Sequence, residues 1–243
     1  MSDSERTRSF APNGLDRNLR RLKRPLQTLR RALHAVRRRL RPTAQRVYAR
    51  AALAVRPPAQ TDGIRPLTRP EFAQIAAAFP YYNGRWGYMS AALGQASMLI
   101  QRHHLTTALE LGAPVRPIIV GADVMDIKAR PELDPTIPIT IHNATQAPWP
   151  VEDKAYDLFV ALQVFEHLRD RQREAFLEVR RVARHAIISL PIDWEMADPR
   201  NCHHRISNER ALSWFAPISP TRVIEGNGGK HRRLIYVFED LPA

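Results

Sequence analysis

The chain is 243 residues long and 44% of them are apolar, which is enough for one good-sized domain with a hydrophobic core. Its single cysteine, Cys202, excludes an intramolecular disulfide framework. No apolar run approaches the roughly 18 residues of a membrane span, and no signal-peptide core follows the first residues. We therefore expect a soluble cytoplasmic protein.

The net charge of +13 is confined to one segment near the N-terminus. Residues 15–56 hold fourteen Arg or Lys and one acid, whereas residues 57–243 hold 21 side chains of each sign. In residues 15–40 apolar side chains recur at alternating spacings of four and three, like one face of a helix: Leu15, Leu19, Leu22, Leu26, Leu29, Leu33, Val36 and Leu40. This pattern predicts that residues 1–57 form a basic amphipathic helical arm that is partly disordered.

A cationic amphipathic helix suits an anionic membrane surface, such as the inner face of the cell membrane, or an acidic protein partner. Nucleic acid is less favoured, because residues 15–56 contain almost no aromatic side chain that could stack on a base. The alternative interpretation is a solvated basic tail without a partner.

Residues 58–104 are predicted to be a helical lead-in to the domain. Thr68 and Glu71 have capping-box spacing, which predicts a short helix that ends near Phe79. An aromatic-rich loop follows at 80–88, and residues 88–103 show a helical pattern. The aromatic side chains of the loop suit either the lining of a pocket or packing against the edge of a sheet.

From residue 105 onwards, segments typical of strands alternate with segments typical of helices. Apolar runs predict five strands and a closing hairpin, at 106–112, 121–127, 137–144, 156–164, 185–191 and 221–226 with 232–240. A helix is predicted over 170–183, with Phe176, Leu177, Val179 and Val182 on its buried side, and another is predicted to begin at Ser207. The alternation predicts an α/β fold with a parallel sheet and an antiparallel C-terminal edge.

Several motifs occur in a fixed order: TALELG, VMDI, NATQAPWPVEDKAYDLFVALQVFEHL, EVRRVARHAIISLP and RRLIYVFED. In this order they resemble the class I S-adenosylmethionine-dependent methyltransferases, and the resemblance extends over about residues 80–240. It implies a Rossmann-like, mostly parallel seven-stranded sheet over residues 105–243. It also implies S-adenosylmethionine as the cofactor and methyl transfer as the reaction.

The resemblance implies cofactor-binding residues at the ends of the first two strands of the domain. A carboxylate after the second strand accepts hydrogen bonds from the ribose hydroxyls, and Asp126 stands there, with Asp123 as the alternative. Gly112 allows the backbone to approach the ligand after the first strand. Glu110, next to that turn, would orient the amino end of the methionine moiety.

Further along the chain, the resemblance places Asn143 and Ala144 beside the adenine, although Asn143 is equally well interpreted as a turn residue. Gln163 lies at the carboxyl end of the fourth strand, where it would face the ligand crevice. Trp149, between two prolines, is better interpreted as a loop cap than as a recognition group.

The first motif is shorter than in a standard unit. Only 16 residues separate Glu110 from Asp126, against roughly 20 between the glycine turn and the ribose acid of dinucleotide folds. Pro117 also prevents a normal helix from starting in 113–117, so the first helix is expected to be vestigial or absent. That loss removes a phosphate-binding helix terminus, and S-adenosylmethionine carries no phosphate.

The acid–base candidates lie after the fourth and fifth strands. His167 and His204 are the predicted catalytic residues, and Glu166, Asp193 and His203 are further candidates. Adjacent ligands without a distant partner pair make a poor zinc site, so we expect no metal at Cys202, His203 and His204.

The favoured function is methyl transfer from S-adenosylmethionine to a small-molecule, glycan or lipid-linked acceptor, with an oxygen as the methylated atom. An RNA methyltransferase that uses the basic arm is one alternative, although the neutral domain argues against it. The other is a non-catalytic protein that keeps the methyltransferase fold and uses the arm to bind partners.

Overall fold

The computed structural model describes residues 63–130, 132–195, 205–226 and 232–242. The basic arm predicted for residues 1–57 lies outside these ranges, as does His204. The arm and its partners therefore stay predictions.

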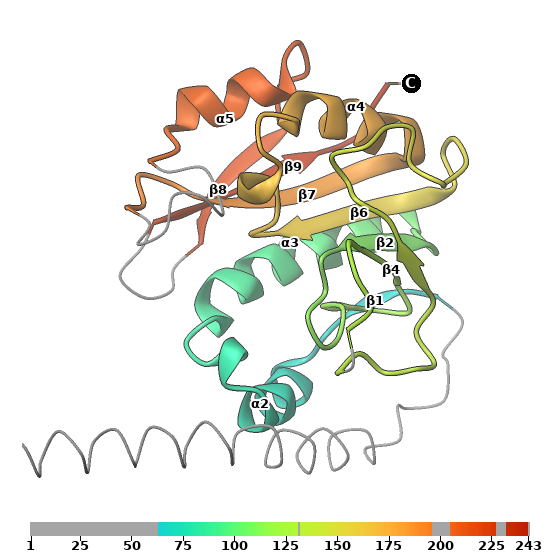
Figure 1. Cartoon of the computed structure of the whole chain (residues 1–243). Coiled ribbons are helices and arrows are strands. Elements are labelled where there is room, and N and C mark those ends of the chain that lie inside the picture. The colour runs from blue at the N-terminus through green and yellow to red at the C-terminus, as the bar shows by residue number, and fades with distance from the viewer. Residues whose placement is uncertain (1–62, 131, 196–204, 227–231, 243) are drawn as a thin grey trace, which may run out of the picture. The chain divides into compact units, whose positions relative to one another are not determined.

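A seven-stranded sheet forms the centre of the described part of the chain, with the order β5-β4-β2-β6-β7-β9-β8 (Figure 1). The bounds of its strands are β2 (Ala108–Leu111), β4 (Asp123–Asp126), β5 (Ile139–Ile141), β6 (Tyr156–Leu162), β7 (Ala183–Pro191), β8 (Arg222–Gly226) and β9 (Arg233–Phe238). The pairs from β5 to β7 are parallel, and β9 is antiparallel to both β7 and β8. The predicted Rossmann-like sheet with an antiparallel C-terminal edge is confirmed.

On one face of the sheet, α3 (Trp86–His103) packs against β7, β8 and β9. It is preceded by α2 (Arg69–Ala78) and the short 3-10 helix η1 (Pro80–Tyr82). The predicted capping box of α2 is present, because Thr68 Oγ1 accepts a hydrogen bond from the Glu71 backbone and the Glu71 carboxylate accepts one from the Thr68 backbone. Helix α3 ends at His103, and its C-cap residue His104 adopts a left-handed conformation with φ 52°.

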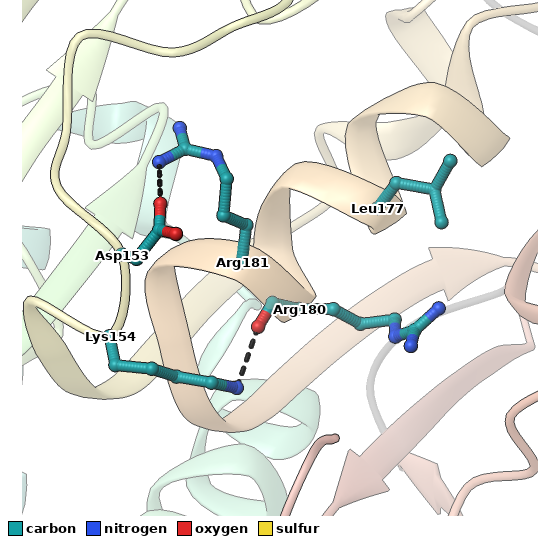
Figure 2. A pocket seen from close by; sticks show the side chains of 5 residues that line it. All are labelled: Asp153, Lys154, Leu177, Arg180 and Arg181. Carbon is teal, nitrogen blue, oxygen red and sulfur yellow. Dashed lines mark hydrogen bonds and ion pairs between the residues drawn. The ribbon is translucent and has the colours of Figure 1, made fainter. Parts of the chain in front are cut away.

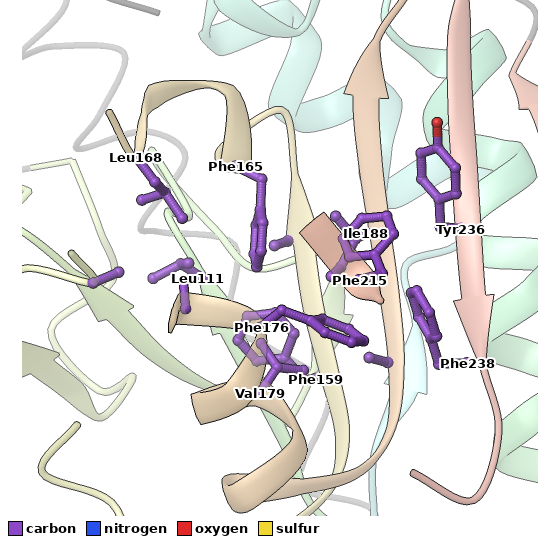
Figure 3. Close-up of a cluster of buried hydrophobic side chains, with 14 of the residues drawn as sticks. Leu111, Phe159, Phe165, Leu168, Phe176, Val179, Ile188, Phe215, Tyr236 and Phe238 are labelled. Carbon is purple, nitrogen blue, oxygen red and sulfur yellow. The ribbon is translucent and has the colours of Figure 1, made fainter. Parts of the chain in front are cut away.

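The opposite face is covered by α4 (Gln172–Val182) and α5 (Asn208–Phe215) (Figure 1). Between them and the sheet lies the main hydrophobic core, where Phe176 packs against Phe215 and Phe238 (Figure 3). As predicted, α5 begins after Ser207, whose side chain accepts a hydrogen bond from the Arg210 backbone. Burial of these large aromatic side chains fixes both helices on the sheet.

One core prediction for α4 is wrong. Phe176, Val179 and Val182 are buried, but the side of the helix that carries Leu177 faces outwards and that residue is 48% exposed. Leu177 follows Phe176 directly, and successive helical residues point about 100° apart, so it leaves the stripe that spacings of three and four create.

Leu177 borders a small pocket at the C-terminal end of α4, which Figure 2 shows. The cations around this pocket already have partners: Lys154 Nζ donates to the carbonyl of Arg180 at 2.7 Å, and Arg181 pairs with Asp153 at 2.7 Å. Lys154 also donates to the carbonyls of Ala183 and Leu241. We interpret this cluster as a cap for the end of the helix, which satisfies carbonyls that lack an intrahelical donor.

Residues 112–118, between β2 and β3 (Ile119–Val120), form turns and contain no helix, as expected from the prolines. Strand β3 pairs with β1 (Arg65–Pro66) in a two-residue antiparallel ladder that the sequence did not indicate. In the part of the chain that is described, no helix is long and apolar enough to cross a membrane.

Candidate active site

The strand order reverses at one point of the sheet. From β2 the chain proceeds outwards through β4 to β5, and it then returns to the other side of β2 to form β6 and β7. In open α/β sheets, ligands bind outside the carboxyl ends of the strands at such a switch point. The residues that follow β2 and β6 therefore border the candidate site.

Gly112 follows β2 directly and needs to be glycine for two reasons. Its φ is 78°, in the left-handed region, and its N–H donates to the carbonyl of Met125 at 2.9 Å. A Cβ at this position would lie 2.8 Å from Cγ2 of Val164, which follows β6. The turn thus joins the ends of the two strands that flank the switch point.

We expect Gly112→Ala to lower the free energy of unfolding by about 1–3 kcal/mol, because alanine is strained at this φ and clashes with Val164. Urea denaturation measures this change. Gly94→Ala is the matched control, because Gly94 lies in α3 and a Cβ added there would meet nothing within 4 Å, so this change should raise stability by about 0.5–1 kcal/mol. Equal effects of the two substitutions would contradict the strain argument.

Glu110 is buried in β2 and its carboxylate holds the turn that follows the strand. Oε2 accepts hydrogen bonds from the backbone N–H groups of Ile118 at 2.7 Å and Ile119 at 3.4 Å. Burial raises the pKa of this carboxyl to about 8, and the two backbone hydrogen bonds oppose that rise. Glu110 therefore closes the segment 112–118, where a standard unit has its first helix.

Asp126 ends β4 at the position predicted for the ribose carboxylate, and it is 3% exposed. Arg130 contacts both of its oxygens, with Nε 2.9 Å from Oδ2 and a terminal nitrogen 3.4 Å from Oδ1. The backbone N–H of Lys128 donates to Oδ1 at 3.3 Å. The carboxylate thus lies where the sequence predicts, but a neighbouring guanidinium holds its acceptor positions. Asp123, the alternative, accepts a hydrogen bond from the Tyr156 hydroxyl at 2.8 Å.

Asn143 and Ala144 lie in a turn that follows β5. The side-chain oxygen of Asn143 accepts from the backbone N–H of Thr145 at 3.1 Å and from its hydroxyl at 2.9 Å, which is the geometry of an Asx turn. The carbonyl of Ala144 accepts from the indole of Trp149 at 3.2 Å, and that indole packs against Phe159. In this structure both residues shape the loop around Trp149.

Gln163 follows β6 with a positive φ of 58°, and its side chain contacts residues of β7 and β9. Its Nε2 donates to Ser189 Oγ at 3.2 Å, and its Oε1 accepts from Arg233 Nε at 3.2 Å. The guanidinium of Arg233 lies over the ring of Tyr88, 4.6 Å from its centroid, and over that of Trp194. An aromatic and cationic wall therefore borders the carboxyl ends of β6 and β7.

Sequence reasoning missed Arg233 and Arg85, which donates to the Tyr88 hydroxyl at 3.3 Å. Tyr88 belongs to the aromatic-rich segment for which a pocket lining was one of two interpretations. It is fully buried, and burial raises the pKa of its phenol to about 12. No pattern in the sequence connects Arg233 with this segment, because the two lie at opposite ends of the domain.

The short 3-10 helix η2 (Phe165–His167) carries both acid–base candidates that follow β6. Glu166 is 3% exposed, and its Oε2 has no hydrogen-bond partner within the described structure. Burial raises the pKa of this carboxyl to about 8, while the charges of Arg233 and Arg85 lower it. The His167 side chain is 48% exposed, and its Nε2 lies 4.0 Å from Glu166 Oε1. Of the two, Glu166 is the buried group with an available oxygen.

A comparison with family models supports the assignment of this fold. Residues 115–186 match the family model described as "Methyltransferase domain", a segment that runs from the turn after β2 into β7. The match covers part of the chain and agrees with the class I S-adenosylmethionine-dependent methyltransferases that the motifs resemble. The resemblance inferred from the motifs is thereby confirmed. The cofactor that this resemblance implies is S-adenosylmethionine.

Solved methyltransferase structures are similar to this chain at a low level. A protein from Methanosarcina mazei is 12% identical with a TM-score of 0.42, over 58% of this chain and 97% of its own. The N-methyltransferase NodS from Bradyrhizobium japonicum, in complex with S-adenosyl-L-homocysteine, is 16% identical with a TM-score of 0.44, over 62% and 86%. An enzyme from Aquifex aeolicus is 16% identical with a TM-score of 0.39, over 54% and 81%. No protein of curated function matches the sequence. At this level of similarity, these structures carry no information on the function of the present chain.

Proposed function

We propose that this methyltransferase methylates a hydroxyl group of a small-molecule, glycan or lipid-linked acceptor. The observation that carries the proposal is the buried carboxyl of Glu166, which lies beside the switch point and has one oxygen without a hydrogen-bond partner among the described residues. A hydroxyl is a weak nucleophile until its proton is removed, so O-methylation benefits from a base at this position.

The residues present fit S-adenosylmethionine if Arg130 moves. Asp126 offers a buried carboxylate at the end of β4, and Gly112 makes the tight turn that the fold needs at the end of β2. When bound, the cofactor supplies a methyl group that is already activated on a sulfonium. The protein therefore has to bind and orient the two substrates and exclude water from them. Asp126 would accept hydrogen bonds from the ribose hydroxyls in place of those from Arg130.

Glu166 would accept the proton of the acceptor hydroxyl through Oε2. A pKa of about 8 keeps a useful fraction of this carboxyl ionised near neutral pH and makes it a stronger base than an ordinary glutamate. Arg85 and Arg233 favour the ionised form, because their charges lower the pKa that burial raises.

The second candidate function is that of a binding protein, which has the methyltransferase fold but does not catalyse methyl transfer. It is favoured by the internal partners of the predicted cofactor groups. Arg130 holds Asp126, the backbone of Ile118 and Ile119 holds Glu110, and Arg233 and Ser189 hold Gln163.

Calorimetric titration of the full chain with S-adenosylmethionine separates the two candidates. We expect one binding site in the wild-type protein and at least a tenfold loss of affinity in Asp126→Asn, because that change removes the charge of the carboxylate that would bind the ribose. Asp123→Asn is the control and should bind like the wild type. If the wild-type protein does not bind the cofactor, the catalytic proposal fails and the binding protein is favoured. If only Asp123→Asn loses affinity for S-adenosylmethionine, the ribose-binding carboxylate is Asp123 and not Asp126.

A further inference from the structure

Three metal-binding side chains meet at the end of the sheet opposite to the candidate active site. His103 is the last residue of α3, His185 lies near the start of β7, and Asp240 follows β9. Because β7 begins where its parallel neighbours begin, these residues lie at the amino ends of the parallel strands, whereas Glu166 and Gly112 lie at the carboxyl ends. We refer to His103, His185 and Asp240 as the histidine cluster.

The donor atoms of the histidine cluster face one another. One ring nitrogen of each histidine and one carboxylate oxygen of Asp240 all lie within 4.8 Å of one another. The two imidazole rings pack with their centroids 4.4 Å apart, and His185 is 3% exposed. Its Nδ1 accepts a hydrogen bond from the Asp240 backbone at 3.3 Å, and its Nε2 lies 4.0 Å from Asp240 Oδ1.

A further carboxylate orients the cluster from outside. Glu239 Oε2 lies 3.0 Å from His103 Nε2, and Arg222 and Arg102 hold Glu239 at 2.8 Å and 3.2 Å. Histidines that bind metals usually donate their second ring N–H to a carboxylate or carbonyl, which fixes the ring and the nitrogen that faces the metal. Glu239 occupies that place for His103.

We propose that the histidine cluster binds one divalent transition-metal ion, of which Zn²⁺ is the type. Two imidazoles with one carboxylate suit Zn²⁺, Co²⁺ or Ni²⁺, whereas Mg²⁺ and Ca²⁺ prefer oxygen ligands alone. Three protein ligands leave a fourth position for water. The cluster does not include Cys202, His203 or His204, from which no metal site was expected.

Binding needs only a small local movement. Ligand atoms about 2.0–2.2 Å from one ion lie closer together than the present donors, so Asp240 has to approach the two rings. Its side chain is 81% exposed and can do so. Coordination through His185 Nε2 would move the ring proton to Nδ1 and release the long hydrogen bond from the Asp240 backbone.

The bound ion would connect three segments that are distant in the chain: the end of α3, the start of β7 and the residues after β9. Such a connection stabilises the folded state, because the unfolded chain does not hold these ligands together. The site is structural, lies away from the candidate active site, and does not depend on the proposed function.

Calorimetric titration of the full-length, untagged protein with ZnCl₂ tests the proposal. We expect the wild-type protein to bind Zn²⁺ at the histidine cluster. Its melting temperature should rise with Zn²⁺ but not with Mg²⁺. His103→Gln and Asp240→Asn should each weaken the binding at least tenfold and remove the gain, and both positions have solvent-accessible side chains that tolerate substitution. Glu239→Gln should weaken binding about tenfold through the orientation of His103.

His104→Gln is the matched control, since it changes an exposed histidine next to His103 that is outside the cluster. It should bind Zn²⁺ like the wild type. The proposal is overturned if the wild-type protein gains no stability with Zn²⁺. It is equally overturned if the affinity and the gain survive in both His103→Gln and Asp240→Asn, which would place the ion at other residues.

Discussion

Replacing Arg130 by alanine is expected to tighten the binding of S-adenosylmethionine about tenfold. Both contacts of the Arg130 guanidinium go to the Asp126 oxygens, at 2.9 Å and 3.4 Å, and the ribose hydroxyls of the cofactor would use the same oxygens. If Asp126 binds the ribose as proposed, the cofactor would have to displace the guanidinium first in the wild-type chain, so only a fraction of the molecules would be ready to bind. Without Arg130 that competition disappears.

The same substitution should lower stability in the absence of the cofactor. Asp126 is buried, and without Arg130 the hydrogen bond that its carboxylate keeps within the described part of the chain is the one from the Lys128 backbone. A buried carboxylate that loses a charged partner costs about 1–3 kcal/mol of unfolding free energy, and the lower end applies here because the Arg130 side chain is 32% exposed. A general disturbance of the fold would lower both the stability and the affinity for S-adenosylmethionine. A higher affinity together with a lower stability therefore points to the competition between Arg130 and the cofactor.

Calorimetry with S-adenosylmethionine and urea denaturation measure the two effects. Lys128→Ala is the control, because it removes a neighbouring positive charge that forms no ion pair with Asp126 in the described structure, and it should leave the affinity unchanged. If Arg130→Ala instead weakens binding, Arg130 is part of the cofactor site and does not compete with the ligand.

The elements of this fold that the sequence predicts well are those fixed by local chemistry. The Thr68–Glu71 capping box and the Ser207 cap place the starts of two helices, because donor and acceptor are only three residues apart. Pro117 likewise removes the helix between β2 and β4 through the geometry of its own ring. The order of the motifs then gives the order of the strands.

The side-chain contacts that form the candidate active site cannot be predicted from such local patterns. Arg130 and Asp126 are four residues apart, but no helix connects them. A helical pattern in the sequence therefore could not have predicted their ion pair. Arg233 reaches Gln163 across 70 residues of sequence. Glu166 and His167 are adjacent, and only the 3-10 turn that carries them decides that the acid faces inwards and the histidine outwards. The partners of long side chains depend on the tertiary structure, and spacing along the sequence does not predict them.

Replacing Glu166 by glutamine is expected to lower kcat/KM by about 10²–10⁴, the usual contribution of a general base. Glutamine keeps the shape of the side chain but cannot take a proton. The affinity for S-adenosylmethionine should stay within about twofold, since Glu166 is assigned to the acceptor and not to the cofactor. Release of S-adenosylhomocysteine, with a hydroxylated acceptor found by screening, measures the rate. His167→Gln is the matched control on the same turn, and a larger loss there would make His167 the base.

The pH dependence should carry the signature of Glu166 as well. Because the pKa of the carboxyl is about 8, wild-type activity should rise with pH up to about 8 and then level off, while Glu166→Gln should be low and nearly flat. A wild-type profile that is already level at pH 6 would contradict the assignment.

Stability provides a readout of Glu166 that requires no acceptor. The folded-state pKa lies above the ordinary value of 4.5, so burial of the neutral carboxyl adds stability that is complete below about pH 4.5 and is lost as the pH rises through about 8. Glutamine never ionises, so the stability of Glu166→Gln relative to the wild type should increase from pH 5 to pH 9. Glu110 shares the raised pKa but is present in both proteins, so the difference between the two urea denaturation curves isolates Glu166. A difference that does not change with pH would mean that Glu166 titrates like an exposed acid, and the base would then have to be sought elsewhere.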